Sequence, residues 1–324
     1  MRIAQVDLSA RPHAELVLQN NGAGISLSDR ACESLGDHAA VKTGFYSGND
    51  RRWIRKRNGV VPRAKSFLEV TSAEIAEETP SLQGIAGKRK YIPMVRGGAA
   101  AFVKPTQWYV DWSVDAVNEY RRKGTNPARF QNSAFYFGDG IAVPMVASGR
   151  ITGALLESRL FDQGIVGVFP HDPRLLMYFL GFFNSTIATD LVRQVNPTAN
   201  NSANYLKRLP IVLPYPEELS TIDRLVHQAI DQVRQGGAVT DSLQREIDSI
   251  YSRLWYGETR CLAFQNSELA ECDAELGENS TLANCEVSAP CLQSALACVP
   301  SSNYDRVEIG ERGNEPALTR KDQP

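Results

Sequence analysis

The feature that most constrains the fold is a change in hydrophobic periodicity at residues 172–173. Before it, residues 41–170 carry short apolar runs, such as those at 141–147, 151–156 and 164–169, separated by glycine-containing turns. After it, apolar residues recur every three or four positions, which is the spacing of one face of a helix. Strands followed by helices predict an α+β protein with an irregular, mixed, sheet-rich part and a separate helical part.

Two details refine the expected strands. The run WYVDW at 108–112 alternates, so Trp108 and Trp112 share one face of a strand. We expect both tryptophans to lie in the core and not to serve as stacking platforms. Pro144 lacks a backbone N–H, so we expect the strand at 141–147 to lie at a sheet edge or to contain a bulge.

A buried core helix is predicted at 173–194. Asp172 can accept the first free backbone N–H groups, and Pro173 suits the first helical position. Only nine residues, 175–183, are free of polar side chains. A membrane helix needs about 20 apolar residues, so we expect no membrane partner.

Region 216–257 predicts a helical hairpin, because it holds two apolar stripes with helical spacing. The first stripe spans 222–233. Ser220 with Asp223 resembles a capping box before it, and the glycine pair at 236–237 ends it. A shorter helix is predicted near the N-terminus, at 26–35.

The last residues, 258–324, hold 12 acidic and 5 basic side chains with few aromatics, and we expect them to be disordered. Five of the six cysteines lie between Cys261 and Cys298 without a C-x-x-C pair, so we expect no metal site. No hydrophobic leader follows Met1, which predicts a cytoplasmic protein and not a secreted, disulfide-bonded one.

The net charge of −2 conceals two oppositely charged regions. Residues 41–210 hold 23 Lys and Arg against 13 Asp and Glu, whereas the rest of the chain holds 12 against 24. This asymmetry is expected when one region faces a polyanion such as nucleic acid.

Basic side chains cluster within 41–160, where 19 Lys and Arg stand against 10 Asp and Glu. One such cluster alone is usually a solvated face, but several together favour nucleic acid. Lys and Arg contact phosphates, and Arg also reads base edges. The predicted DNA-binding residues are Arg51, Arg52, Arg55, Lys56, Arg57, Arg96, Lys104, Arg121, Arg122, Lys123 and Arg129.

The sequence offers no catalytic residues. It has no G-x-S-x-G elbow and no phosphate-binding P-loop, and its four histidines are too far apart to share a metal on one element. Asn196-Pro197-Thr198-Ala199 lacks the second proline and the aromatic residue of the Asn-Pro-Pro-aromatic signature of amino-directed DNA methyltransferases. No F-x-G-x-G loop is present to hold S-adenosylmethionine, so we expect no cofactor in this chain and interpret 196–199 as a polar loop leaving a helix.

Four consecutive phrases resemble the target-recognition domain of TaqI-like and BREX (phage-growth-limitation) adenine-specific DNA methyltransferases. VKTGFYSGNDRRWIR (41–55) is similar to the segment that opens that domain, and KYIPMVRGGAAAFVKPTQWYVDW (90–112) to the stretch after it. The next two segments of that domain resemble FQNSAFYFGDGIAVPMVASGRITGALL (130–156) and LLMYFLGFFNSTIATDLVRQVNPTANNSANYLKRLPI (175–211). The last of these contains an L-N-S helix, an L-N-P-T turn and an L-P-I exit.

The resemblance implies DNA recognition without catalysis. It matches Asn196-Pro197-Thr198 to a structural turn. It places the catalytic motif and S-adenosylmethionine in a separate Rossmann-like domain, which we expect on another chain or lost from this one. The implied partners are double-stranded DNA and a methyltransferase catalytic subunit. The expected parts are an N-terminal connecting segment (1–40), a recognition domain (41–215), the hairpin (216–257) and the acidic tail (258–324).

The resemblance also suggests structural roles for some polar and small residues. Asn184 and Ser185 are expected to satisfy backbone groups at a helix or turn. Gly44, Gly48, Gly97 and Gly98 are expected to shape turns.

Three alternatives remain open from the sequence. The chain is a non-functional fragment of a split methyltransferase gene, a protein-interaction module that uses its helices and acidic tail, or an unrecognised enzyme. The poor inventory of catalytic groups argues against the last.

Overall fold

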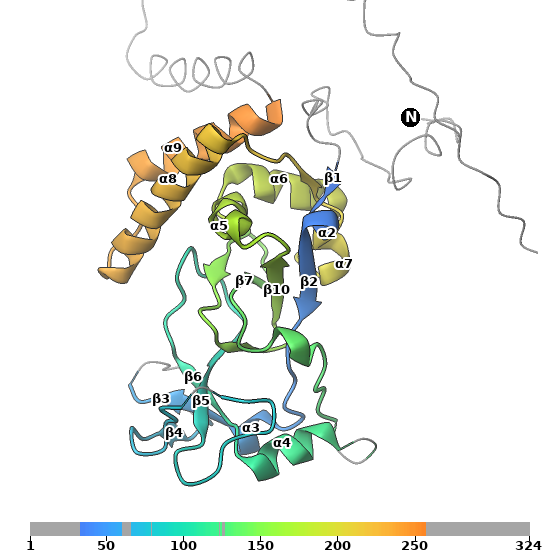
Figure 1. The fold of residues 1–324 in the computed structure, drawn as a ribbon, viewed down its shortest axis with the longest axis vertical. Coiled ribbons are helices and arrows are strands. Elements are labelled where there is room, and N and C mark those ends of the chain that lie inside the picture. Colours follow the sequence, from blue (N-terminus) through green and yellow to red (C-terminus); the bar gives the residue numbers. More distant parts are fainter. Residues whose placement is uncertain (1–32, 60–65, 79, 123, 125–126, 257–324) are drawn as a thin grey trace, which may run out of the picture. The chain divides into compact units, whose positions relative to one another are not determined.

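The computed structural model describes residues 33–59, 66–78, 80–122, 124 and 127–256 (Figure 1). All of them belong to the first of two compact units, residues 1–275. The described part is an α+β fold with separate sheets and helices, as the sequence predicts. The acidic tail, with its cysteines, and most of the connecting segment lie outside the described residues.

A four-stranded antiparallel sheet lies at the centre of the fold, and both its faces are buried. Its order is β2-β10-β7-β8. Along β10, Val166 and Val168 face a first hydrophobic core, whereas Ile165 and Phe169 face a second core. The strands are β2 (Ala39–Thr43), β7 (Ile141–Pro144), β8 (Ala154–Leu155) and β10 (Ile165–Pro170).

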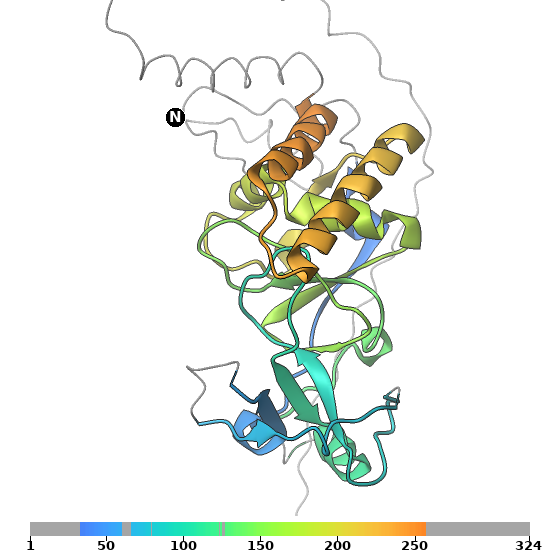
Figure 2. The same ribbon diagram turned by 90° about the vertical axis from the view of Figure 1, so that its left-hand side faces the viewer.

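Helices supply most of the first core. Helix α5 packs on β7 and β10, η3 leads into it, α6 follows, and the hairpin α8–α9 packs on α5 (Figures 1 and 2). Gly181 of α5 allows the close approach, because a Cβ there would lie 2.5 Å from the Tyr251 hydroxyl. These elements are η3 (Pro173–Leu175), α5 (Leu176–Phe183), α6 (Thr186–Val195), α8 (Pro216–Arg234) and α9 (Asp241–Tyr256).

A five-stranded mixed sheet borders the second core and has only one face in it. Its order is β4-β3-β6-β5-β9. Ile54, Ile92 and Val110 pair across three strands and point into the second core. The elements are α3 (Asp50–Trp53), β3 (Ile54–Arg57), β4 (Glu69–Val70), β5 (Tyr91–Val95), β6 (Trp108–Asp111), α4 (Val114–Arg121) and β9 (Leu160–Phe161).

Short elements close the fold where the chain enters and leaves the sheets. A two-stranded ladder pairs β1 with β11, so Glu33 lies opposite Ile211. The helix predicted at 26–35 is wrong in its described part, because Glu33 and Ser34 are in a strand and the helix starts only at Leu35. The remaining elements are β1 (Glu33–Ser34), α2 (Leu35–His38), η2 (Ser133–Phe135), α7 (Ala203–Leu206) and β11 (Pro210–Ile211).

The core helix predicted at 173–194 is two helices that bend by 81° at Asn184 and Ser185. The Asn184 amide donates to the carbonyls of Leu180 and Gly153, both at 2.8 Å. The Ser185 hydroxyl accepts from the N–H of Ala188 and so begins α6. The two residues therefore satisfy backbone groups, as expected, but by stopping one helix and starting another.

Within the described ranges no single helix is long and apolar enough to cross a membrane. The bent pair of 173–183 with 186–195 has the necessary length and composition only when its two arms are taken together.

Pro144 does not place its strand at a sheet edge, so that prediction is wrong. Strand β7 lies between β10 and β8, but β8 pairs only with Ile141 and Ala142. Pro144 stands opposite Ile165 at the end of the strand, where β7 has one neighbour. A missing N–H is tolerated at that position even in an interior strand.

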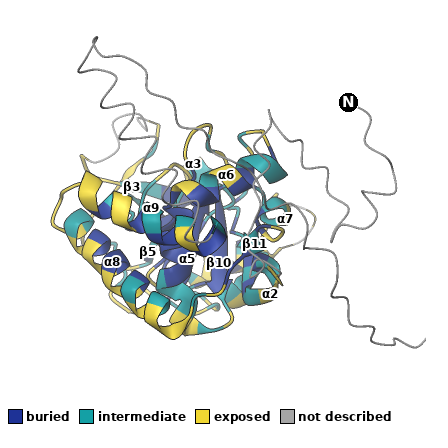
Figure 3. Ribbon diagram, turned by 90° about the horizontal axis from the view of Figure 1, so that it is seen from above, coloured by how far each residue is buried: buried dark blue, intermediate teal, exposed yellow. Residues whose placement is uncertain are grey.

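The tryptophans and the hairpin largely follow the sequence. Trp112 is fully buried in the second core, and Trp108 packs against it. Both hairpin helices are present, with exposed residues on their outer sides (Figure 3). The predicted cap is wrong: α8 starts at Pro216, one turn earlier, and Ser220 lies inside it with its hydroxyl donating to the Pro216 carbonyl.

Candidate nucleic-acid interface

The basic segment 49–57 folds as helix α3 followed by strand β3. The Asn49 side chain accepts from the N–H of Arg52 at 3.2 Å and so starts the helix. Trp53, buried at the end of the helix, packs edge-on against Tyr120 of α4 at 5.2 Å. Helices α3 and α4, which carry two of the predicted basic clusters, therefore adjoin.

A partly buried ion network holds this segment to the rest of the five-stranded sheet. Arg96, after β5, donates to Asp50 of α3 at 2.5 Å and to Asp162 at 3.1 Å. Burial raises the pKa of Asp162, and the Arg96 guanidinium opposes that rise. The Ser47 hydroxyl donates to the other oxygen of Asp50 at 2.5 Å. Arg96 therefore positions α3, and its donors already serve two carboxylates.

Lys104 is also engaged inside the fold. Its ammonium group donates to the carbonyls of Gly97, at 3.2 Å, and Gly98. Burial lowers its pKa to about 8, although Asp162 acts in the opposite direction. Gly98 has a φ of +97°, so it forms the turn expected of it. Gly44 is required for another reason: a Cβ there would lie 2.3 Å from the Phe161 carbonyl oxygen.

The other cations of the segment differ in how far they are engaged. Arg51 and Arg52 are exposed on α3, and the Arg52 guanidinium lies 4.0 Å from the centre of the Trp53 ring. Arg55 lies over Tyr91 and donates to the Arg52 carbonyl at 3.0 Å. Lys56 forms an ion pair with Glu69 at 3.3 Å. Arg57 is exposed at the end of β3.

The cations at and after α4 form a second group. Arg121 donates to the Leu82 carbonyl at 2.7 Å and lies over Phe130. Arg122 forms an ion pair with Glu119 at 3.2 Å, and Arg129 is exposed. Lys123 lies outside the described residues.

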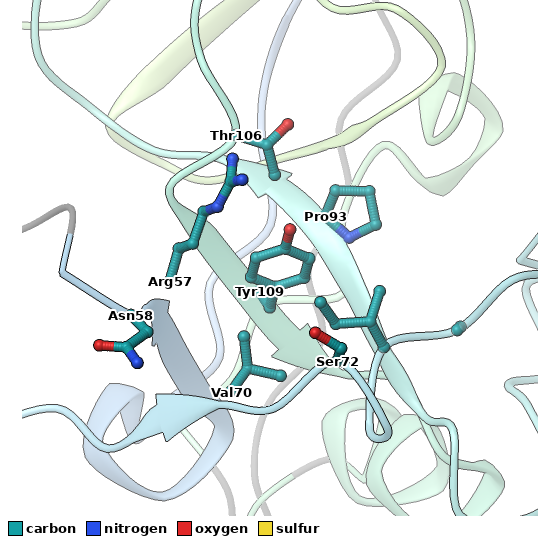
Figure 4. A pocket seen from close by; sticks show the side chains of 9 residues that line it. Arg57, Asn58, Val70, Ser72, Pro93, Thr106 and Tyr109 are labelled. Carbon is teal, nitrogen blue, oxygen red and sulfur yellow. The ribbon is translucent and has the colours of Figure 1, made fainter.

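A hollow of about 540 Å³ opens on the outer face of the five-stranded sheet, away from the second core (Figure 4). Tyr109 of β6 is at its centre, and its hydroxyl points towards the Arg57 guanidinium and Thr106. The lining residues are Arg57, Asn58, Val70, Ser72, Ile75, Ala76, Pro93, Thr106 and Tyr109.

Sequence reasoning identified Arg57 but missed Asn58, Ser72 and Tyr109. A signal for Tyr109 was available, because alternation in WYVDW places it on the face opposite the core tryptophans. No local pattern brings Ser72 to this face, since it comes from the loop after β4.

The Asn-Pro turn at 196–198 is a structural feature, as the sequence indicates. The Asn196 side chain accepts from the N–H of Thr198 at 3.2 Å and donates to the Asn200 carbonyl at 2.6 Å. Arg193 donates to the carbonyls of Thr198 and Ala147, which ties the turn to the loop after β7. The described residues hold no group of three or more His, Cys, Asp or Glu side chains arranged for a metal.

Comparisons with known proteins do not establish a family for this chain. No family model matches the sequence. No curated protein matches it either. Among solved structures, the chain is similar to the HsdS subunit from Thermoanaerobacter tengcongensis, with 16% identity over 74% of this chain and 48% of that chain. The TM-score is 0.27, and the chain spans about half the length of that structure.

Proposed function

We propose that this chain is the DNA-recognition part of an adenine-specific DNA methyltransferase from a restriction-modification or BREX-type phage-defence system. The catalytic domain, with S-adenosylmethionine, belongs to another chain or has been lost. The chain acts in the cytoplasm, where it meets double-stranded DNA and the catalytic subunit.

The observation that carries the proposal is the rigid presentation of cations on α3 and β3. Arg96 fixes this segment through Asp50, while Arg51, Arg52 and Arg57 are exposed. A DNA-contacting surface needs its cations held in one register, because phosphate contacts set the position of a protein on the duplex. The adenine specificity and the type of system rest on the resemblance of 41–215 to the recognition domains of such enzymes.

Duplex binding by fluorescence anisotropy tests the proposal. The full chain is expected to bind DNA with an affinity that falls steeply as salt rises, because bound cations displace counterions from phosphates. Replacing Arg51, Arg52 and Arg57 together by Gln should weaken binding on every duplex. A matched control replaces three exposed cations of the hairpin, Arg224, Arg245 and Arg253, by Gln and should bind as the wild type does.

A chain that folds stably but binds no duplex at low salt would instead favour the fragment or the protein-interaction module. The methyltransferase assignment has its own test. Co-expression with a subunit carrying Asn-Pro-Pro-Tyr should give site-specific methylation of plasmid adenine, whereas the chain alone should show no calorimetric binding of S-adenosylmethionine.

A further inference from the structure

The hollow on the five-stranded sheet has an unusual lining. Five of its side chains are polar, namely Arg57, Asn58, Ser72, Thr106 and Tyr109, and none of the lining residues is acidic. The guanidinium carries a positive charge, and the amide and the three hydroxyls can all donate hydrogen bonds. Such a lining suits an anion.

The Thr106 hydroxyl accepts from the Arg159 guanidinium at 3.2 Å, which leaves the polar groups of Arg57, Asn58, Ser72 and Tyr109. Among the described residues, none of the four makes a side-chain hydrogen bond or ion pair. Tyr109 is the most informative, because its ring packs in a small cluster with Val70 and Tyr91, while its hydroxyl points into the hollow and makes no hydrogen bond within the described residues. The Tyr109 hydroxyl is therefore open to a ligand in the hollow.

The charged neighbours on the same sheet are engaged with one another. Lys56 pairs with Glu69 at 3.3 Å, and Lys90 pairs with Asp111 at 2.6 Å. The Glu74 carboxylate accepts from the hydroxyl and the N–H of Thr71. The paired carboxylates of Glu69 and Asp111 repel an incoming anion less than free ones. Glu74 keeps its negative charge, and its pKa is lowered by the hydrogen bonds from Thr71 and then by the positive charges of Arg55 and Lys90.

The sheet fixes the backbone from which two of these groups extend. Tyr109 pairs with Arg55 across β3 and β6, and the Arg57 N–H donates to the Gln107 carbonyl at 2.8 Å. Arg57 and Tyr109 therefore extend from adjacent, hydrogen-bonded strands towards the same space (Figure 4).

We propose that this hollow binds one phosphodiester group of the DNA, with Arg57 and the Tyr109 hydroxyl as its main donors and Asn58 and Ser72 beside them. This rests on the proposed function. A phosphate is favoured over a base edge, because charge-assisted donors are strongest towards an anionic oxygen and none of the lining residues is acidic.

The test uses the full chain, with Arg57→Gln and Tyr109→Phe measured by fluorescence anisotropy on two unrelated duplexes over a series of salt concentrations. Arg57→Gln should reduce the slope of log affinity against log salt by about 1, because one phosphate contact is lost. Tyr109→Phe should weaken binding up to about tenfold on both duplexes, as expected for a lost hydrogen bond to a charged group. Arg224→Gln and Tyr215→Phe are the matched controls and should leave both quantities unchanged.

Each other outcome has a definite meaning. If the wild type binds DNA but Arg57→Gln leaves the slope unchanged, the hollow does not bind a phosphate of the DNA, and the proposed function still stands. A loss confined to one of the two duplexes would assign a base contact to the hollow and overturn the inference. Saturation of the hollow by inorganic phosphate, with duplex affinity unaffected by Arg57→Gln, would assign the site to a free anion and also overturn it. A wild type that binds no duplex at low salt overturns both proposals.

Discussion

The two larger sheets of this protein differ in what covers them. The four-stranded sheet is buried on both faces, and the residues of β7 and β10 alternate between two hydrophobic cores. The five-stranded sheet has one face in the second core and leaves Arg57 and the hollow on the other. A sheet buried on both faces presents no side chains to a ligand. The five-stranded sheet keeps polar groups on its second face, beside the small cluster of Val70, Tyr91 and Tyr109.

The largest expected effect is a loss of stability that leaves DNA affinity unchanged. Phe183→Ala in α5 removes a fully buried ring from the first core and should lower the free energy of unfolding by about 3–5 kcal/mol. Urea unfolding measures the loss. The DNA affinity of the folded fraction should stay the same, and a parallel fall in affinity would mean that the helical part contributes to the DNA surface.

Asp50→Asn tests whether α3 must be held in place. The change breaks the ion pair with Arg96 and should destabilise the protein by about 1 kcal/mol, since both side chains are partly exposed. It also removes a negative charge near the basic segment, which on charge alone should strengthen DNA binding. We expect weaker binding instead, because α3 loses its anchor. Stronger binding by anisotropy would show that net charge matters more than position.

Lys104 should make the free energy of unfolding depend on pH. Its folded pKa of about 8 lies below its ordinary value of 10.5, so between those two pH values the unfolded chain binds more protons than the folded chain. Stability from this group should therefore rise with pH, by about 1–2 kcal/mol between pH 7.5 and 9.5. Lys104→Met should lack that rise in urea unfolding at the two pH values. An equal rise in both proteins would show that Lys104 is not the source.

The smallest expected effect is the change in stability when a tyrosine hydroxyl is removed, compared at two positions. Tyr178 in the first core donates to the Val212 carbonyl at 2.6 Å, so Tyr178→Phe should cost about 1 kcal/mol. Tyr109→Phe removes a hydroxyl without a partner among the described residues and should change stability by less than about 0.5 kcal/mol. Thermal melts of both variants check this. Equal losses would mean that the Tyr109 hydroxyl has a structural partner.

Much of the fold follows from local patterns in the sequence. Period-two alternation places Trp112 and Val110 in one core, and helical spacing gives the hairpin its two apolar stripes. Asp172 caps the turn before α5, accepting from the N–H of Arg174 at 3.0 Å, as its position before a proline predicts. These features depend on residues only a few positions apart, so the sequence displays them directly.

The sequence alone determined the α+β class, the hairpin and the region where cations concentrate. Only the tertiary structure decided which cations are committed to the fold. Arg96 and Arg57 look alike in the sequence, but Arg96 meets two carboxylates from distant segments, whereas Arg57 faces a hollow. The bend at Asn184 likewise depends on the Gly153 carbonyl, 31 residues away. Such contacts are set by how strands and helices pack across the chain, and no local spacing of residues encodes them.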